Sequence, residues 1–329
     1  MLAVLKANAY GHGLTTIAQA LEEADGLAVA VVGEAVQLRQ ASCRQNIVVF
    51  EGFLSVEECQ ASSQYQLDPV AHDQRQRDWL TQQPFSPPTT VWLKLNTGIN
   101  RLGFPPADIP AVWKTLQACP WVKEIILMSH LASADIDRTK TQAQRACLDA
   151  VSASLATADN SLQGSMANSA GVFASPETHY DWVRPGIAMH GISPLAQSTG
   201  LSYGLQPVMT LRSQLIAIQT LTADDAVGYH GQWRCPELMC VGVVGIGYGD
   251  GYPQNAPVGT PLLVNGQQVV LIGRVSMDML TVNLRSLPTG IPFGLGEGFA
   301  GGKRTQRFAY ELVCGVQRDL EGRLYIRGV

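Results

Sequence analysis

Lys6 lies in surroundings that favour reaction of its amine with a carbonyl group. It follows a short apolar run, residues 2–5, so we expect it at the end of a strand. A strand-end lysine is usually a solvated surface residue. Here Asn8, Tyr10 and His12 follow closely, and two glycines among them let the backbone approach a bound group. The run therefore predicts an amine that forms a Schiff base.

Schiff-base lysines serve pyridoxal phosphate enzymes and class I aldolases, and this run alone is compatible with both. The length of 329 residues and the 46% hydrophobic content predict about two globular domains. A net charge of -4 argues against nucleic acid or an anionic membrane as partner. The scattered cysteines form no CxxC pair, no metal site is expected, and no apolar stretch is long enough to span a bilayer. We infer free thiols in a reducing cytoplasm.

Strand-like apolar runs alternate with helix-like segments through the first two thirds of the chain. Eight strand-helix units predict an α/β fold with an N-terminal (β/α)8 TIM barrel, whose chemistry lies at the C-terminal strand ends. Lys6, His130, Asn168 and Arg184 fall at such ends. The predicted strands are 2–5, 27–32, 47–50, 67–71, 91–95, 122–128, 162–166 and 181–183, with helices that include 15–24, 33–41, 55–64, 105–119 and 135–158.

The pattern changes after about Leu205 to strand-like runs separated by Gly, Pro and Asn turns. The runs predict a C-terminal mainly-β domain. We therefore expect the barrel over residues 1–205 and the β-domain over 206–329. The runs are 208–218, 238–246, 261–264, 269–272 and 278–284.

The string KANAYGHG at residues 6–13 resembles the cofactor-lysine signature of alanine racemases, whose fold is also a barrel followed by a β-domain. The resemblance implies that Lys6 carries pyridoxal 5'-phosphate and that Tyr10 helps to bind it. Family members begin with a strand and helix upstream of this lysine, so we expect a truncated N-terminus. Residues 291–309 and 317–329 depart from the family pattern.

Residues 182–187, WVRPGI, end the eighth strand and open a short helix, whose free backbone N-H groups suit a phosphate. The resemblance implies that Arg184 faces the pyridine nitrogen of the cofactor, and that Gly186 and Ile187 belong to its binding site. Arginine keeps its proton, which weakens the electron sink and suits racemisation.

Two further strand ends match family segments. Residues 165–170, SMANSA, imply that Asn168 lies near the cofactor and that Ser169 binds its phosphate, although an Asn-Ser pair also suits a helix cap. His130 resembles the histidine that stacks on the cofactor ring.

Residues 93–103, LKLNTGINRLG, resemble a second signature. It implies that Arg101 positions the substrate carboxylate and that Lys94 is a candidate for carbamylation.

Racemisation needs two acid-base groups on opposite faces of a planar carbanion, and the barrel segments supply Lys6 for one face. Residues 227–233 resemble the family's catalytic tyrosine segment, so Tyr229 is expected to reach the active site of the other subunit in a homodimer. Segments 245–252 and 274–278 imply that Tyr248 narrows the entrance and that the backbone N-H of Met277 binds the substrate carboxylate.

We therefore expect a pyridoxal phosphate enzyme that interconverts L- and D-alanine and supplies D-alanine for peptidoglycan. Lys6 exchanges the proton on the D side and Tyr229 on the L side. The alternatives are a broader racemase acting on serine or basic amino acids, a non-catalytic pyridoxal phosphate carrier, and a class I aldolase. The aldolase leaves the phosphate and ring-nitrogen residues unexplained, and simple cofactor binding needs no second proton carrier.

Overall fold

The computed structural model describes residues 1–156, 162–287, 295–296 and 324–326. The chain divides into two compact units, residues 1–189 with 193–198, and residues 190–192 with 199–329. The atypical stretches 291–309 and 317–329 lie outside the described residues, apart from 295–296 and 324–326.

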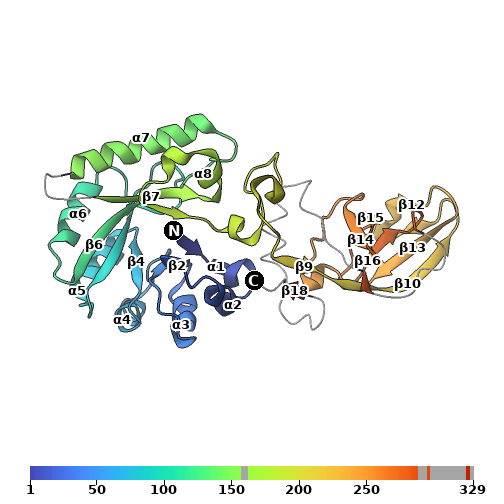
Figure 1. Cartoon of the computed structure of the whole chain (residues 1–329), viewed down its shortest axis with the longest axis horizontal. Coiled ribbons are helices and arrows are strands. Elements are labelled where there is room, and N and C mark those ends of the chain that lie inside the picture. The colour runs from blue at the N-terminus through green and yellow to red at the C-terminus, as the bar shows by residue number, and fades with distance from the viewer. Residues whose placement is uncertain (157–161, 288–294, 297–323, 327–329) are drawn as a thin grey trace. The chain divides into compact units, whose positions relative to one another are not determined.

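The first unit is the predicted barrel, with eight parallel strands that pair in chain order (Figure 1). The Val4 amide donates to the Pro185 carbonyl at 3.0 Å, which joins the first strand to the end of the last. The barrel prediction is confirmed. The strands are β1 (Leu2–Val4), β2 (Gly26–Val29), β3 (Ile47–Val49), β4 (Asp68–Ala71), β5 (Thr89–Lys94), β6 (Val122–Met128), β7 (Gln163–Asn168) and β8 (Trp182–Arg184).

Helices lie outside the barrel strands and bury their apolar faces against them (Figure 1). The Ser55 and Asp137 side chains cap the helices that follow them. Several predicted bounds were wrong: the helix predicted to end at residue 24 stops at Ala20, the one predicted over 135–158 covers Arg138–Leu155, and the one predicted from residue 105 begins at Ile109. The helices are α1 (Lys6–Tyr10), α2 (Leu14–Ala20), α3 (Val32–Gln40), α4 (Val56–Gln64), α5 (Gln74–Gln82), α6 (Ile109–Gln117), α7 (Arg138–Leu155) and α8 (Ser169–Ala174).

The late start of the helix at Ile109 has a local cause. The consecutive prolines at 105 and 106 lack amide hydrogens, and the Asp108 amide bonds the Pro105 carbonyl at 3.1 Å to close a turn instead. The helix begins directly after this turn, with Pro110 in its first positions.

The second unit is mainly β, as predicted. Its largest sheet has the strand order β14-β15-β16-β13-β10-β17, with antiparallel neighbours from β14 to β17. Two smaller pairs are β11-β12 and β18-β9. The strands are β9 (Met209–Leu211), β10 (Ser213–Leu221), β11 (Ala226–Val227), β12 (Trp233–Arg234), β13 (Met239–Val244), β14 (Pro261–Val264), β15 (Gln267–Ile272), β16 (Leu280–Asn283), β17 (Leu295–Gly296) and β18 (Leu324–Ile326).

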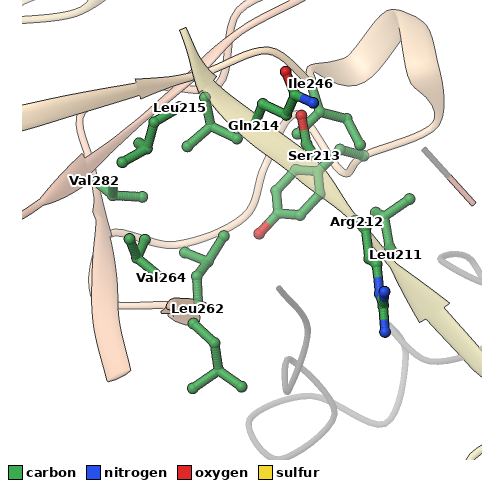
Figure 2. Close-up of a pocket in the computed structure, with 12 residues that line it drawn as sticks. Leu211, Arg212, Ser213, Gln214, Leu215, Ile246, Leu262, Val264 and Val282 are labelled. Carbon is green, nitrogen blue, oxygen red and sulfur yellow. The ribbon is translucent and has the colours of Figure 1, made fainter. Parts of the chain in front are cut away.

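A pocket lies in the second unit, beside its largest sheet (Figure 2). Its walls are mostly aliphatic, with Leu215, Leu262, Val264 and Val282 among them. Tyr252 also lines it, and burial raises the pKa of this phenol to about 12. The lining holds no lysine, so this pocket is not the site of the predicted Schiff base.

Candidate active site

Lys6 begins a short helical segment, α1 (Lys6–Tyr10), whose backbone is left-handed. The φ angles of Ala7, Asn8, Ala9 and Tyr10 are 54°, 56°, 52° and 53°. Left-handed backbone costs L-residues about 1–2 kcal/mol each, so four in succession require support from their surroundings. A strained turn therefore directly follows the predicted cofactor lysine.

Side chains within and beside the turn supply this support. Asn8 Oδ1 accepts from the Leu14 amide at 2.8 Å. The imidazole Nδ1-H of His12 bonds the carbonyl of Tyr10 at 2.8 Å. Glu34 of α3 accepts from the amides of Asn8 at 3.3 Å and Ala30 at 2.9 Å. Asn8 and His12, which follow Lys6 closely in the sequence, therefore bond the backbone of the turn.

A cluster of cationic side chains occupies the C-terminal end of the barrel strands. Burial and the charges of Arg184, Arg101 and Lys6 hold the pKa of the Lys94 amine well below its usual value. Burial, followed by the charges of Lys94, Arg184, Arg101 and Lys6, likewise lowers the pKa of His130. Every charge that acts on these two groups in the described chain is positive. The cluster is therefore suited to bind anions.

Arg184 is fixed in the centre of this cluster by hydrogen bonds. Its Nη2 donates to the carbonyls of Ser129 at 2.5 Å and Met166 at 3.1 Å, and its Nη1 donates to Ser165 Oγ. Only 3% of Arg184 is exposed, and burial lowers its pKa to about 9. Nη2 also lies 3.4 Å from His130 Nδ1, an arrangement that requires an unprotonated acceptor nitrogen.

A group of hydroxyl and amide donors lies around Gly186. A side chain at this position would clash with Tyr10, because an added Cβ would lie 2.2 Å from Tyr10 Oη. Ser169 Oγ accepts from the amides of Gly186 at 2.9 Å and Ala188 at 3.3 Å. Ile187 begins the short helix η2 (Ile187–His190) in the same segment. These residues bring together the donor types that hold a phosphate.

Asn168, predicted either to lie near the cofactor or to cap a helix, caps α8. Its Oδ1 accepts from the Gly171 amide at 3.0 Å, and its Nδ2 lies 3.5 Å from the Leu131 carbonyl. The cap does not test a contact with the cofactor, which stays a prediction.

Arg101 lies on an exposed loop that begins after β5 and folds back against the end of that strand. Phe104 N donates to the Lys94 carbonyl and Asn96 N to the Phe104 carbonyl, both at 2.9 Å. Gly103 has a φ of 120°, and an added Cβ would lie 3.0 Å from Lys94 Cγ, so glycine is needed there. The loop places the Arg101 charge near Lys94 and His130.

In the second unit, the segments of Tyr229, Tyr248 and Met277 converge. Tyr248 N donates to the Ser276 carbonyl at 3.0 Å, and Gly249 N to the Met277 carbonyl at 2.7 Å. Gly228, which precedes Tyr229, has a φ of 76°, and its added Cβ would lie 3.1 Å from Arg274 N. The side chains are exposed, by 66% for Tyr229, 37% for Tyr248 and 61% for Met277.

Comparison with known proteins identifies the family of both units. The alanine racemase N-terminal domain matches residues 1–194, and the alanine racemase C-terminal domain matches residues 208–323. The chain belongs to the alanine racemase family. It is 45% identical over 323 residues to alanine racemase of Nitrosomonas eutropha, covering 96% of this chain and 89% of that protein. Alanine racemase of Nitrosococcus oceani is 46% identical over 88% of this chain and 80% of its own length.

Solved alanine racemases share the fold. The biosynthetic alanine racemase of Pseudomonas aeruginosa superposes with a TM-score of 0.89 at 37% identity, covering 96% of this chain and 90% of that chain. Alanine racemase of Bartonella henselae, solved with covalently bound pyridoxal phosphate, gives a TM-score of 0.81 at 26% identity, with coverage of 96% and 90%. The family expectation is confirmed.

The barrel unit brings together all the predicted residues that it contains, and the second unit gathers its own three. No role was predicted for Glu34, Ser129 or Gln144, although all three bond segments of the site. Gln144 left a signal in the sequence, since it interrupts the apolar buried face of α7 with an amide. Among the described residues no helix is long and apolar enough to cross a membrane.

Proposed function

We propose that this chain is a pyridoxal phosphate-dependent alanine racemase that interconverts L- and D-alanine. The observation that carries the proposal is the group of basic side chains Lys6, Arg101 and Arg184, whose positive charges act together on the buried Lys94 and His130. Such a cluster needs anions, and the phosphate of the cofactor and the carboxylate of an amino acid supply them.

The residues of the barrel unit fit the cofactor. Lys6 would hold it through an imine bond, Tyr10, Ser169, Gly186 and Ile187 would hold its phosphate, and Arg184 would donate to the ring nitrogen. When bound, the cofactor supplies an electron-withdrawing ring that weakens the Cα-H bond of the amino acid. Asn168 and His130 would contact the ring from their strand ends.

Proton transfer is assigned to two groups. Lys6 Nζ exchanges the proton on the D face of Cα, and Tyr229 Oη exchanges it on the L face. Tyr229 belongs to the second unit and is largely exposed. We infer that it serves the barrel of a partner subunit in a homodimer, with Tyr248 at the entrance. Arg101 and the Met277 amide would bind the substrate carboxylate.

Lys94 has the properties of a carbamylation site. Its lowered pKa favours the neutral amine over the ammonium, and the neutral amine is the form that adds carbon dioxide and releases a proton. The resulting carbamate is an anion beside Arg101 and Arg184, where it would offset the surrounding positive charge.

The cellular role follows from the activity. D-alanine made by this chain would supply peptidoglycan. The described cysteines, which all lack disulfides, support a reducing cytoplasm as the compartment. A racemase that also accepts serine or basic amino acids remains the second candidate, because the exposed side chains of Tyr248 and Met277 would border the substrate in either case.

The proposal is tested by incubating cofactor-saturated protein with enantiopure L-alanine and following D-alanine by chiral chromatography. Borohydride reduction followed by peptide mapping locates the cofactor. We expect an equal mixture of enantiomers and a pyridoxyl label on Lys6. Alanine that keeps its handedness, or a label on another lysine, would overturn the proposal, and a serine or lysine series run in parallel identifies a broader racemase.

A further inference from the structure

Gln144 joins the two loops that carry Arg101 and His130, through hydrogen bonds to Thr97 and to the backbone of residues 130 and 132. It projects from the buried face of α7 and is 1% exposed. Its Nε2 donates to Thr97 Oγ1 at 3.0 Å and to the His130 carbonyl at 2.9 Å. Its Oε1 accepts from the Ala132 amide at 2.9 Å. The side-chain nitrogen thus donates both of its hydrogens, and the side-chain oxygen accepts one hydrogen bond.

The hydrogen bonds continue from Gln144 to Arg184. Thr97 Oγ1 lies 2.7 Å from Ser129 Oγ, which donates its single hydrogen to the Leu95 carbonyl at 3.0 Å. Thr97 is therefore the donor to Ser129. The Ser129 carbonyl in turn accepts from Arg184 Nη2 at 2.5 Å. Hydrogen bonds therefore connect α7 to Arg184 through Thr97 and through Ser129, whose hydroxyl takes part in one bond and whose carbonyl takes part in the next.

A buried amide is costly unless it is fully hydrogen-bonded, and an aliphatic residue would fit the same helix face without that requirement. Gln144 lies on the same buried face as Leu148, Val151 and Leu155. Because its bonds all end on two loops at the mouth of the barrel, their effect is to hold those loops in one arrangement.

We propose that Gln144 is a positioning residue for substrate binding. It holds Thr97 at the base of the Arg101 loop and the backbone of His130, so that Arg101 faces the substrate carboxylate. This inference rests on the proposed function. The three hydrogen bonds of Gln144 go to Thr97, the His130 carbonyl and the Ala132 amide, so its loss should weaken carboxylate binding while attachment of the cofactor at Lys6 continues.

The test compares Gln144→Met and Thr97→Val with Thr141→Val in the holoenzyme. Thr141 is an apt control because it is also 1% exposed on α7, and its hydroxyl bonds the Asp137 carbonyl of its own helix. Propionate, which has the carboxylate of alanine and no amine, is titrated by calorimetry. Kinetic constants, thermal stability and borohydride-trapped cofactor are measured on the same samples.

We expect Gln144→Met and Thr97→Val each to weaken propionate binding and raise the KM for alanine about tenfold, because both break the hydrogen bond between Gln144 and Thr97 that holds the Arg101 loop. The double variant should bind propionate less weakly than the product of the two single effects predicts, because both changes break the same Gln144–Thr97 bond. Thr141→Val should keep its propionate affinity while losing similar thermal stability. Cofactor loading at Lys6 should be equal in all variants.

Equal propionate affinity in Thr97→Val and Thr141→Val would overturn the inference, as would additive effects in the double variant. Thr97→Val decides the matter alone if Gln144→Met does not fold. The proposed function fails separately: a wild-type holoenzyme that binds propionate and racemises no alanine contradicts the activity, while the differences in propionate binding still test Gln144.

Discussion

The two units present their candidate residues in opposite ways. In the barrel unit Lys94 and Arg184 are 9% and 3% exposed, and a hydrogen-bond network fixes Arg184. In the second unit, Tyr229 and Met277 are 66% and 61% exposed, and the Met277 carbonyl accepts a backbone hydrogen bond from Gly249 N.

This difference indicates that the two units have different roles in the proposed site. Burial in the barrel unit shifts the pKa values of Lys94 and His130 and fixes donors before any ligand arrives, as expected of a preorganised anion site. An exposed phenol and thioether gain such an environment only when another surface covers them. This exposure is what the proposed dimer requires of a second unit that completes a site on another subunit.

The largest expected effect on racemisation comes from a change in the barrel unit. Lys6→Ala removes both cofactor attachment and one proton carrier, so racemisation should fall by about 10³-fold or more. Chiral chromatography and borohydride trapping measure the two losses. The control is Lys123→Ala, which removes an exposed lysine on β6 and should leave both readouts unchanged. Substantial racemisation by Lys6→Ala would contradict the assignment.

The matching change on the β-side is Tyr229→Phe, which keeps the ring and removes the hydroxyl that carries the proton. Abstraction from L-alanine should fall about 10²- to 10³-fold, and much more than abstraction from D-alanine. Deuterium wash-in from each enantiomer measures the two rates. Tyr252→Phe, a buried change within the same unit, serves as the control. Equal losses in both directions would refute the two-base roles.

A pH dependence distinguishes the buried cluster from the exposed surface. The pKa of folded His130 lies well below its usual 6.5, so below about pH 6.5 the unfolded chain binds a proton that the folded chain does not. Stability is therefore lost as the pH falls. In cofactor-free protein, His130→Asn should reduce the slope of unfolding free energy against pH by up to about 1.4 kcal/mol per pH unit.

Urea unfolding at pH 7, 6 and 5 measures that slope. His230→Asn is the matched control, because His230 is exposed in the β-unit and its left-handed φ of 65° suits asparagine. A slope that is the same in His130→Asn and in the wild type would show that this histidine does not contribute.

The smallest expected effect concerns the strained turn after Lys6. Glu34→Gln replaces one of two carboxylate acceptors with an amide nitrogen, so one of the bonds to Asn8 and Ala30 is lost. The free energy of unfolding should fall by about 1 kcal/mol. Urea unfolding of Glu34→Gln is compared with that of Glu23→Gln, which changes an exposed residue. An equal change in unfolding free energy in both variants would show that Glu34 does not stabilise the turn.

Periodicity predicted the barrel strands and the β-domain because apolar runs have the length and spacing that burial requires. Strand ends then located Lys6, His130 and Arg184, since a parallel barrel gathers these ends at one face. The left-handed turn was not predictable, because Ala7 and Ala9 have no preference for that conformation and contacts with Glu34 support it. The bonds of Gln144 likewise join residues up to 47 positions apart.

The claim that one site needs both regions is tested most directly by subunit complementation. Lys6→Ala and Tyr229→Phe chains are co-expressed with different affinity tags, and mixed dimers are isolated by purification on both tags. A shared site predicts about half of wild-type activity per mixed dimer, because one of its two sites has both Lys6 and Tyr229. Activity no higher than that of either variant alone, or failure to obtain mixed dimers, would contradict the account.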